Sequence, residues 1–404
     1  MENFKAVILA AFLFTLLFNT KSRGQDKTAR IVNSLNEVIV PIKTMNPDSS
    51  FSDLDFLKQT LENRDIVSLG EATHGTKEFF LYKVRLTQFL VSELGFKAIA
   101  FESDFSAVQL LDDFINNKVE EIDRGFGGFP LTQETRDMLF WLRKYNQTQT
   151  IQNRVHLYGL EARGFSGISA SILHSFNNLT AESKALLTRI RDTRYNALNK
   201  KDIKAVKSII PQLYQEADLN KISLNRHYIT LLDQAVNHYL DRNSGKRDEF
   251  MADNVTWLQE NTNAEKVIIW AHNGHLSKSP LFGAPSMGTH LYRKFKFRYF
   301  VIATAFNQGS VSISVPKNGK IDWINKFFPA VTSKNNYEYY FQQCKFPNFM
   351  IEISSLNDHE VLTPFFSQNI VMRMVGATGG LLNNKLSILK NFDLIVFFNS
   401  TNPG

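Results

Sequence analysis

Side chains that can transfer protons are concentrated in the segment GEATHGTKEF, residues 70–79. Within it, Glu71 lies three residues before His74, and Gly70 and Gly75 favour a tight turn around the pair. Histidine titrates near neutral pH and a carboxylate can fix its tautomer, so the pair suits a general base that activates water. Polar residues at a helix start can act only as caps, but neither Glu71 nor His74 is needed for that. We therefore expect His74 to be the base and Glu71 to orient it.

A second carboxylate, Glu102, follows the apolar run of residues 97–101 in the segment FESD. A carboxylate directly after a buried strand is usually paired, because burial of an unpaired charge is costly. A purely structural ion pair explains Glu102 as well as a functional one does. The candidate partners are His74, His275, Lys83 and Arg85.

Two further histidines lie in the segment WAHNGH, residues 270–275. His272 and His275 are three residues apart, but two histidines with scattered carboxylates are a weak signal for a metal site. The sequence has no HExxH motif, and its single cysteine, Cys344, excludes a thiolate cluster. We therefore expect neither a metal nor a cofactor. Because His272 comes directly after an apolar run, we expect it to be a core histidine and His275 to be functional.

The motifs of several common chemistries are absent from the sequence. It contains no G-x-S-x-G nucleophile elbow, no P-loop and no GxGxxG motif. Cys344 has no histidine near it in the sequence, which favours an idle thiol. The formal charge of +7 is mild and spread along the chain, so we expect no nucleic-acid partner. Acid–base chemistry on a small molecule remains.

Short apolar runs that end in polar residues must position these side chains. Their length and their content of Val, Ile and aromatic residues suit strands that are buried on both faces. Residues 76–94 have apolar residues at helical spacing and are followed by Gly95, which predicts a helix between two parallel, paired strands. The polar clusters then meet at the carboxyl edge of the sheet, where α/β folds build their sites. The predicted strands are residues 65–69, 97–101, 155–159, 267–270 and 299–306.

Residues 168–262 interrupt this pattern, because they are largely helical in periodicity and contain few strand candidates. We interpret them as an inserted helical subdomain and a candidate lid over the site. After Asn307, polar loops alternate with short strands that complete the sheet. The predicted fold is α/β, with a mostly parallel central sheet flanked by helices, in one catalytic domain over residues 25–404.

Residues 1–24 have the pattern of a secretory signal peptide. Lys5 precedes an apolar run, and Ser22 and Gly24 place small residues before a cut at Gln25. The apolar run is too short to span a bilayer comfortably, and an uncleaved anchor is the alternative. We expect an exported protein, periplasmic or secreted, with no membrane span after cleavage.

Taken in order, these segments resemble the erythromycin esterase family. GEATHGTKEF, FESD, RDEFMADN (residues 247–254) and WAHNGH carry the resemblance, which extends from about residue 50 to about residue 400. The family includes macrolide-resistance enzymes that open a macrocyclic lactone by hydrolysis, and many relatives whose substrates are untested. The resemblance implies a hydrolase that works without metal.

The resemblance also implies roles for individual residues. His74 resembles the base that activates water, and Glu71 resembles a carboxylate that the reaction also requires. Glu102 resembles the acidic residue after the second strand, and His275 the second functional histidine. We expect Lys83, Arg85, His272 and Arg247 to contact the substrate or stabilise the oxyanion. Lys83 stands where some members of the family have an Arg. For Arg247, a structural role is the alternative.

The leading hypothesis is a carboxylic ester hydrolase that opens the lactone of erythromycin-type macrolides and confers resistance to them. Water activated by His74 attacks the ester, and His275 with Lys83 stabilises the oxyanion. One alternative is a hydrolase or transferase that acts on an envelope or extracellular ester with the same residues. Another is a catalytically silent envelope binding protein.

Overall fold

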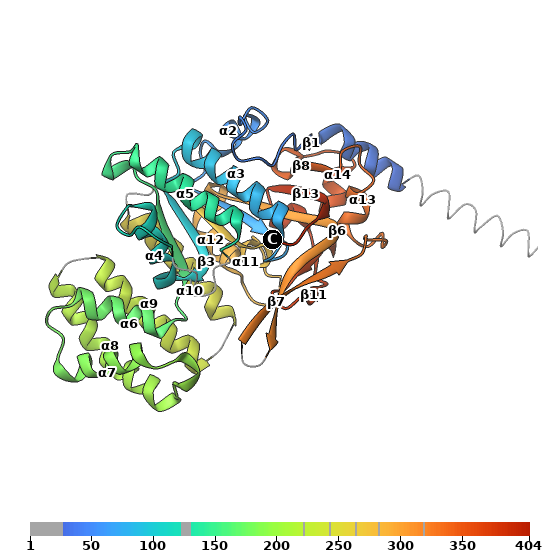
Figure 1. Ribbon diagram of the computed structural model, residues 1–404. Coiled ribbons are helices and arrows are strands. Elements are labelled where there is room, and N and C mark those ends of the chain that lie inside the picture. Colours follow the sequence, from blue (N-terminus) through green and yellow to red (C-terminus); the bar gives the residue numbers. More distant parts are fainter. Residues whose placement is uncertain are drawn as a thin grey trace, which may run out of the picture.

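The computed structural model describes residues 27–122, 131–220, 223–241, 244–262, 265–281, 283–317 and 320–404. Within these ranges, nine strands form one sheet (Figure 1). In spatial order they are β1 (Val40–Pro41), β8 (Asn348–Glu352), β13 (Leu394–Thr401), β6 (Tyr299–Lys317), β2 (Ile66–Glu71), β5 (Val267–His272), β3 (Ala98–Asp104) and β4 (His156–Glu161), with β7 (Lys320–Phe328) paired to β6. Short ribbons are formed by β9 (Ile370–Val371) with β12 (Lys385–Leu386), and by β10 (Met374–Val375) with β11 (Leu381–Leu382).

Helices surround the sheet. Residues 27–38 are helical, and the other helices are α2 (Phe56–Leu61), α3 (Lys77–Leu94), α4 (Phe105–Ile115), α5 (Gln133–Gln147), α6 (Phe165–Ser175), α7 (Ala181–Asp192), α8 (Lys200–Asn220), α9 (Ser223–Asp241), α10 (Ser244–Asn261), α11 (Asn273–Leu276), α12 (Met287–Phe295), α13 (Tyr337–Phe341), α14 (Leu362–Phe366) and α15 (Ile388–Asn391). None of the helices in the described ranges has the length and apolar character that a membrane span needs. The predicted signal peptide, residues 1–24, lies outside the described residues.

The central strands of the sheet are parallel, from β13 through β6, β2, β5 and β3 to β4. The pairings of β8 with β1 and β13, and of β7 with β6, are antiparallel. These pairings confirm the predicted mostly parallel sheet. The prediction that β2 and β3 pair with each other is wrong, because β5 lies between them. Trp270 of β5 is paired with Leu69 on one side and with Phe101 on the other.

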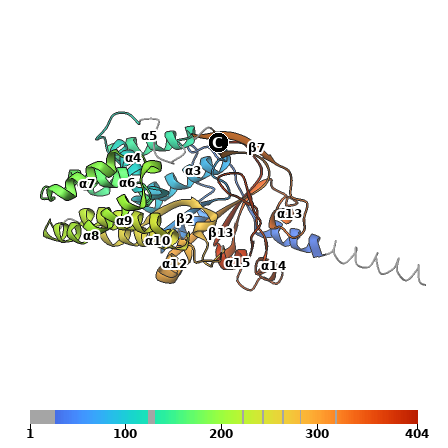
Figure 2. The same cartoon turned by 90° about the horizontal axis from the view of Figure 1, so that it is seen from below.

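Side chains of the central strands alternate between two apolar cores. In β2, Ile66 belongs to the core on one face, and Val67 and Leu69 belong to the core on the other. Figure 2 shows α3 and α5 over one face of the sheet, with α10, α12 and α15 over the other. Helix α3 ends as predicted at Gly95, whose φ of +70° is a conformation that glycine adopts without strain.

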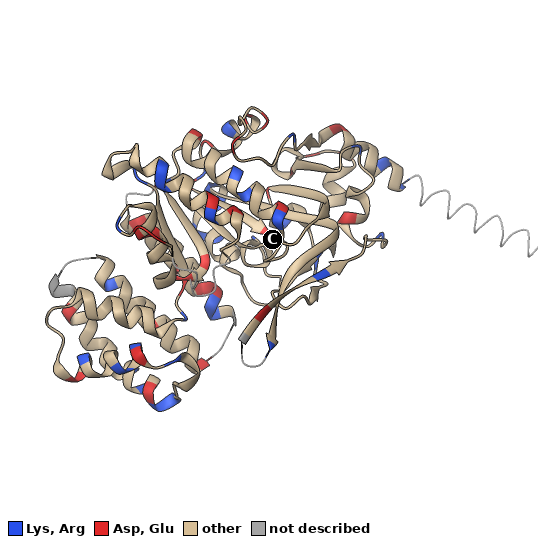
Figure 3. Ribbon diagram, in the orientation of Figure 1, with Lys and Arg blue, Asp and Glu red and all other residues tan. Residues whose placement is uncertain are grey.

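Helices α6 to α9 form a bundle that is inserted between β4 and β5, where the helical insert is predicted. The bundle projects to one side of the sheet (lower left in Figure 1), and both basic and acidic residues are scattered over it (Figure 3). Helix α10 instead packs onto the sheet through Val255 and Leu258. The bundle has a core of its own, which includes Phe165, Ile168, Leu187, Leu213 and Leu232.

The second part of β6 pairs with β7 to form a long hairpin arm, residues 309–317 and 320–328. Two separate strands are predicted on either side of Asn307, but β6 runs continuously from Tyr299 to Lys317. It passes Gly309, whose φ is +131° and where an added Cβ would lie 2.2 Å from the carbonyl oxygen of Thr401. Glycine is thus required by both the backbone angle and the close approach of β13.

Candidate active site

At the carboxyl end of β2, Glu71 binds two partners. Its Oε1 lies 2.7 Å from Nδ1 of His74, and its Oε2 accepts a hydrogen bond from Nζ of Lys83 on α3 at 2.6 Å. An ionised carboxylate can only accept, so Nδ1 of His74 donates and Nε2 carries the lone pair of the neutral ring. Glu71 is buried, whereas 28% of the His74 side chain is exposed. His74 is therefore an oriented base with access to solvent.

The surrounding charges decide the protonation of this pair. Burial raises the pKa of Glu71, but the Lys83 ammonium and the His74 hydrogen bond outweigh burial and lower that pKa to about 2. Burial lowers the pKa of His74, but its bond to Glu71 and the negative charge of Glu102 outweigh burial and raise it above its ordinary value. Glu71 is therefore ionised at neutral pH.

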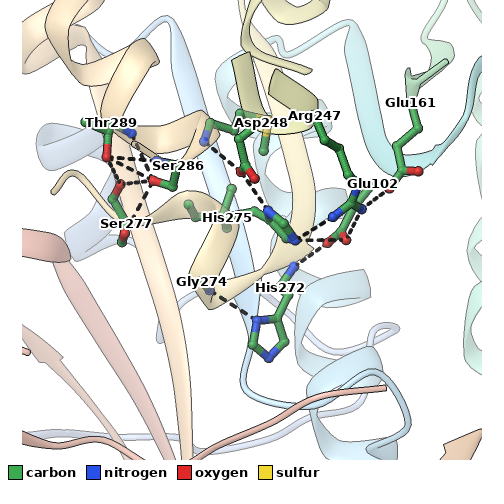
Figure 4. Close-up of polar contacts among 12 residues, drawn as sticks. Glu102, Glu161, Arg247, Asp248, His272, Gly274, His275, Ser277, Ser286 and Thr289 are labelled. Carbon is green, nitrogen blue, oxygen red and sulfur yellow. Dashed lines mark hydrogen bonds and ion pairs between the residues drawn. The ribbon is translucent and has the colours of Figure 1, made fainter. Parts of the chain in front are cut away.

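A second network joins β3, α10 and α11 (Figure 4). Glu102 accepts a hydrogen bond at Oε1 from Nη2 of Arg247 at 2.8 Å, and at Oε2 from the backbone N–H of His272 at 2.9 Å. His275 lies between two carboxylates, with Nδ1 2.7 Å from Oδ1 of Asp248 and Nε2 3.3 Å from Oε1 of Glu102. The network thus fixes the His275 ring from both sides.

These carboxylates set the charge of His275. Burial lowers its pKa, but Glu102 and Asp248 outweigh burial and raise it to about 10. Burial raises the pKa of Glu102, but His275 and Arg247 hold it well below its ordinary range. Nη1 of Arg247 lies 3.0 Å from Nε2 of His275, a contact that alone would suit a neutral ring. We assign the doubly protonated ring, because each of its nitrogens faces a carboxylate.

Arg247 also connects this network to β4. Its guanidinium bonds to Glu161, and the buried carboxylate of Glu161 is also paired with Arg163. Burial lowers the pKa of Arg247, but Glu102 and Glu161 outweigh burial and raise it. Glu102 is therefore neutralised by Arg247 together with the predicted partner His275, whereas the predicted candidates Lys83 and Arg85 pair with other carboxylates.

His272 is a core residue, as its position after β5 predicts. Its ring points away from the carboxylate network in Figure 4, and its residue is 4% exposed. Nδ1 accepts a hydrogen bond from the backbone N–H of Gly274 at 3.2 Å. Burial and the nearby His74 lower the pKa of His272 to about 3, so the ring is neutral. This corrects the placement of His272 on the substrate side.

The two cations of α3 have structural partners. Arg85 is fully buried and pairs with Asp53, with its Nη2 2.5 Å from Oδ1 of Asp53. The placement of Arg85 on the substrate side is therefore wrong. Lys83 borders the site, but it is 2% exposed, bonded to Glu71 and positioned with Nζ 4.3 Å from the ring centre of Trp270. Its evident role is to hold Glu71 in its ionised state.

A buried amide, Asn273, aligns the strand ends that carry the site. Its Nδ2 donates to the carbonyl oxygen of Thr304 in β6 at 2.8 Å. The Thr304 hydroxyl accepts a hydrogen bond from the backbone N–H of Ala72 at 2.9 Å. Gly70 is necessary here, because an added Cβ would lie 2.2 Å from Oδ1 of Asn273. Sequence reasoning missed Asn273, although it lies between the two histidines of WAHNGH.

His74 and His275 line one cleft of about 480 Å³. Besides the charged residues, the arm contributes Ile321 and Trp323, and the sheet contributes Phe101 and Trp270. Among the described residues around the cleft, none comes from α6 to α9, whereas Arg247 of α10, which also falls within the predicted insert, does line it. A lid role for the insert stays a prediction. Sequence reasoning missed the arm, whose signal is the content of Ile, Trp and Phe in KIDWINKFF.

Other candidate chemistry is not supported by the side-chain arrangement. In the part of the chain that the structure describes, no group of three or more His, Cys, Asp or Glu residues is arranged to hold a metal ion. Burial raises the pKa of the Cys344 thiol to about 12, so it stays protonated and a poor nucleophile.

A family model described as erythromycin esterase matches residues 91–401. The chain belongs to the erythromycin esterase family. The matched range contains Glu102, Arg247 and His275, whereas Glu71 and His74 precede it. Membership suggests an esterase or other hydrolase activity.

Individual relatives agree with this assignment at low identity. Erythromycin esterase type II of Escherichia coli is 28% identical over 288 residues, which cover 60% of this chain and 68% of that protein. Erythromycin esterase type I of Escherichia coli is 22% identical and covers 61% of this chain and 72% of its own length.

Solved structures share the fold. A Bacillus cereus protein has a TM-score of 0.80 with 25% identity and covers 93% of this chain and 98% of its own. A mutant of the erythromycin esterase EreC, in its open conformation, has a TM-score of 0.69 with 20% identity and covers 90% of this chain and 97% of its own.

Proposed function

We propose that this protein is a carboxylic ester hydrolase that opens the macrocyclic lactone of erythromycin-type macrolides and so confers resistance to them. The observation that carries the proposal is His74, held by Glu71 with its Nε2 free to accept a proton, in a cleft that His275 and Arg247 also line. Ester hydrolysis needs a base to activate water and positive charge to stabilise the oxyanion, and the cleft contains both.

In the proposed reaction, neutral His74 takes a proton from water at Nε2 while the water oxygen bonds to the lactone carbonyl carbon. The carbonyl oxygen becomes an oxyanion, which the positive charges of His275 and Arg247 stabilise. The ring C–O bond then breaks, and the proton on His74 passes to the leaving alkoxide. One water is consumed, and the product is a ring-opened hydroxy acid.

The macrolide assignment rests on the size and lining of the cleft and on the similarity to the erythromycin esterases of Escherichia coli. A volume of about 480 Å³ suits a drug-sized ligand, and aromatic side chains line part of the cleft. The alternative is an envelope or extracellular ester handled by the same residues. A catalytically silent binding protein is disfavoured, because binding alone does not require His74 to be oriented by Glu71 next to a protonated His275.

The test is to incubate the purified protein with macrolides of different ring sizes and to look for a mass gain of one water. His74→Gln should lower kcat by about 10²–10⁴-fold and keep a native circular dichroism spectrum. The matched control is His272→Gln, which should lose stability more than rate because His272 is buried in the core. Full activity in folded His74→Gln protein would contradict the proposal. A mass gain with envelope esters alone would favour the alternative substrate.

We also propose that the reaction needs no metal. The support is that Nδ1 of His74 is bonded to Glu71 and Nδ1 of His275 is paired with Asp248, so both histidines are held by protein side chains. The rate should be unchanged by EDTA or phenanthroline, and a loss that added zinc restores would overturn the proposal.

We further propose that the protein is exported and matures at Gln25. The support is the sequence pattern of residues 1–24. Sequencing the N-terminus of the protein from its cell envelope or medium should give Gln25, whereas an intact Met1 chain in the membrane fraction would contradict cleavage.

A further inference from the structure

The β6–β7 arm brings exposed apolar side chains to the charged cleft. Ile321 is 71% exposed and Trp323 is 52% exposed, and both line the cavity that contains His74. A large apolar residue that stays exposed loses the free energy that burial would supply, roughly 1.5–3 kcal/mol for a full side chain. These two side chains can regain it only when something apolar enters the cleft.

The arm is fixed to the catalytic turn by main-chain hydrogen bonds. The N–H of Ser312 in β6 donates to the carbonyl oxygen of Gly75 at 2.8 Å, and Gly75 directly follows His74. Trp323 is paired across the hairpin with Ser314, two residues beyond this anchor. The position of Trp323 relative to His74 is therefore set by the backbone.

The loop after the arm is tied to the same turn. The N–H of Val375 donates to the carbonyl oxygen of Ala72 at 2.7 Å. The N–H of Ser314 donates to the carbonyl oxygen of Ala377 at 2.8 Å, and Ala377 lines the cleft. Both ends of the catalytic turn thus support the apolar lining.

We propose that Trp323 and Ile321 form the binding surface for the apolar part of the ester, so that the substrate class is esters with an extended apolar face next to the scissile bond. This inference rests on the proposed function. The charged residues of the cleft are already paired with one another, as Glu71 is with Lys83 and Glu102 with Arg247. His74, His275 and Arg247 are used by the proposed reaction at the ester group, so the apolar residues of the arm are the ones left to contact the rest of the substrate.

The test compares p-nitrophenyl acetate with p-nitrophenyl octanoate, which share a leaving group and differ in apolar length. Trp323→Ala should raise KM for the octanoate by about tenfold and should affect the acetate much less, because the acetate has little apolar surface to lose contact. Ile324→Ala is the matched control, because adjacent strand residues point to opposite faces and Ile324 is also exposed, at 45%. It should change neither ester.

A binding measurement separates this inference from the proposed chemistry. Calorimetry of p-nitrophenyl octanoate with His74→Gln protein should show about tenfold weaker binding when Trp323→Ala is added, and no change when Ile324→Ala is added. If the protein hydrolyses no ester, or if His74→Gln keeps full activity, the proposed function fails. The difference in octanoate binding between the Trp323→Ala and Ile324→Ala variants still tests whether the arm is the binding surface. No octanoate binding, or equal effects of the two alanine variants, would overturn the inference.

Discussion

His74 and His275 have the same side chain, but their neighbours give them different charges. His74 has one carboxylate at Nδ1 and an open Nε2, so it can exchange protons with a substrate. His275 has Asp248 at one nitrogen and Glu102 near the other, so it keeps its proton to about pH 10. A base and a fixed positive charge thus arise from one residue type by differences in contact alone.

The pH dependence of the rate should report the His74 base. Its pKa is raised above the ordinary 6.5, so kcat/KM should fall as pH drops through that raised pKa and protonated His74 accumulates. Glu71→Gln removes the carboxylate that raises the pKa, so the acid limb should move to lower pH and the maximum rate should drop. The control is Glu78→Gln, because Glu78 is a nearby carboxylate on α3 that accepts a hydrogen bond from Asn402. An unshifted acid limb in Glu71→Gln would contradict the assignment.

The stability of the protein should depend on the His275 proton. Its pKa rises from 6.5 to about 10 on folding, so its contribution is fully present below pH 6.5 and is lost as pH rises through 10. One proton corresponds to a slope of up to about 1.4 kcal/mol per pH unit in the free energy of unfolding. Urea unfolding between pH 6 and 10, at roughly unit steps, should show this slope in wild type and its loss in His275→Gln. Parallel curves for the two proteins would contradict the doubly protonated ring.

At the scale of elements, the turn between β2 and α3 is where three segments meet. It carries His74, binds the arm through Gly75 and contacts the last residues of the chain, since the N–H of Gly404 also donates to the Gly75 carbonyl oxygen at 3.1 Å. The turn has no room for a side chain at Gly75, where an added Cβ would lie 2.2 Å from the carbonyl oxygen of Ser312.

Gly75→Ala should therefore displace β6 from the catalytic turn. Overpacking of this kind costs about 1–3 kcal/mol of stability. The rate of hydrolysis should also fall, because the arm and His74 no longer keep their relative positions. Gly380→Ala is the control, since a Cβ there meets nothing within 4 Å and the expected change is within about 0.5 kcal/mol. Thermal unfolding and ester hydrolysis measure the two effects, and a Gly75→Ala protein with normal rate and stability would contradict this account.

Local sequence patterns were sufficient to predict several elements. The apolar runs give β2, β3, β4 and β5 because strands buried on both faces need continuous apolar residues, and Gly95 marks the end of α3. The placement of Glu71 and His74 next to each other also follows from their spacing. These features depend on neighbours in the sequence.

The features that could not be predicted depend on pairing between distant segments. The insertion of β5 between β2 and β3, and the pairing of Arg247 with Glu102, join residues far apart in the chain. Lys83 and Arg85 look alike in sequence, but one faces Glu71 and the other Asp53, because residues two apart on a helix do not share a face. The apolar arm was missed because a short run rich in Ile, Trp and Phe does not show in the sequence whether its side chains are buried or exposed.

At the scale of the whole molecule, the chain divides its apolar residues among three cores. Two lie on the faces of the sheet, and the third belongs to the bundle of α6 to α9. Helix α10 links these parts, because it follows the bundle in the chain and packs on the sheet while its first turns carry Arg247 and Asp248. The cation Arg247 of the candidate site is thus supported by the sheet.

The separate core of the bundle has a consequence for local unfolding. Amides of α7 and α8 should exchange with deuterium as one group, and faster than those of β2 and β5, because opening the bundle leaves the sheet cores intact. Mass spectrometry of exchange at peptide resolution measures this, and a single common rate for bundle and sheet would contradict it. A protease that cuts the opened bundle should then leave α10 seated on the sheet. The nicked protein would keep its cations beside Glu102, so sequence changes within the bundle can accumulate with little effect on the chemistry.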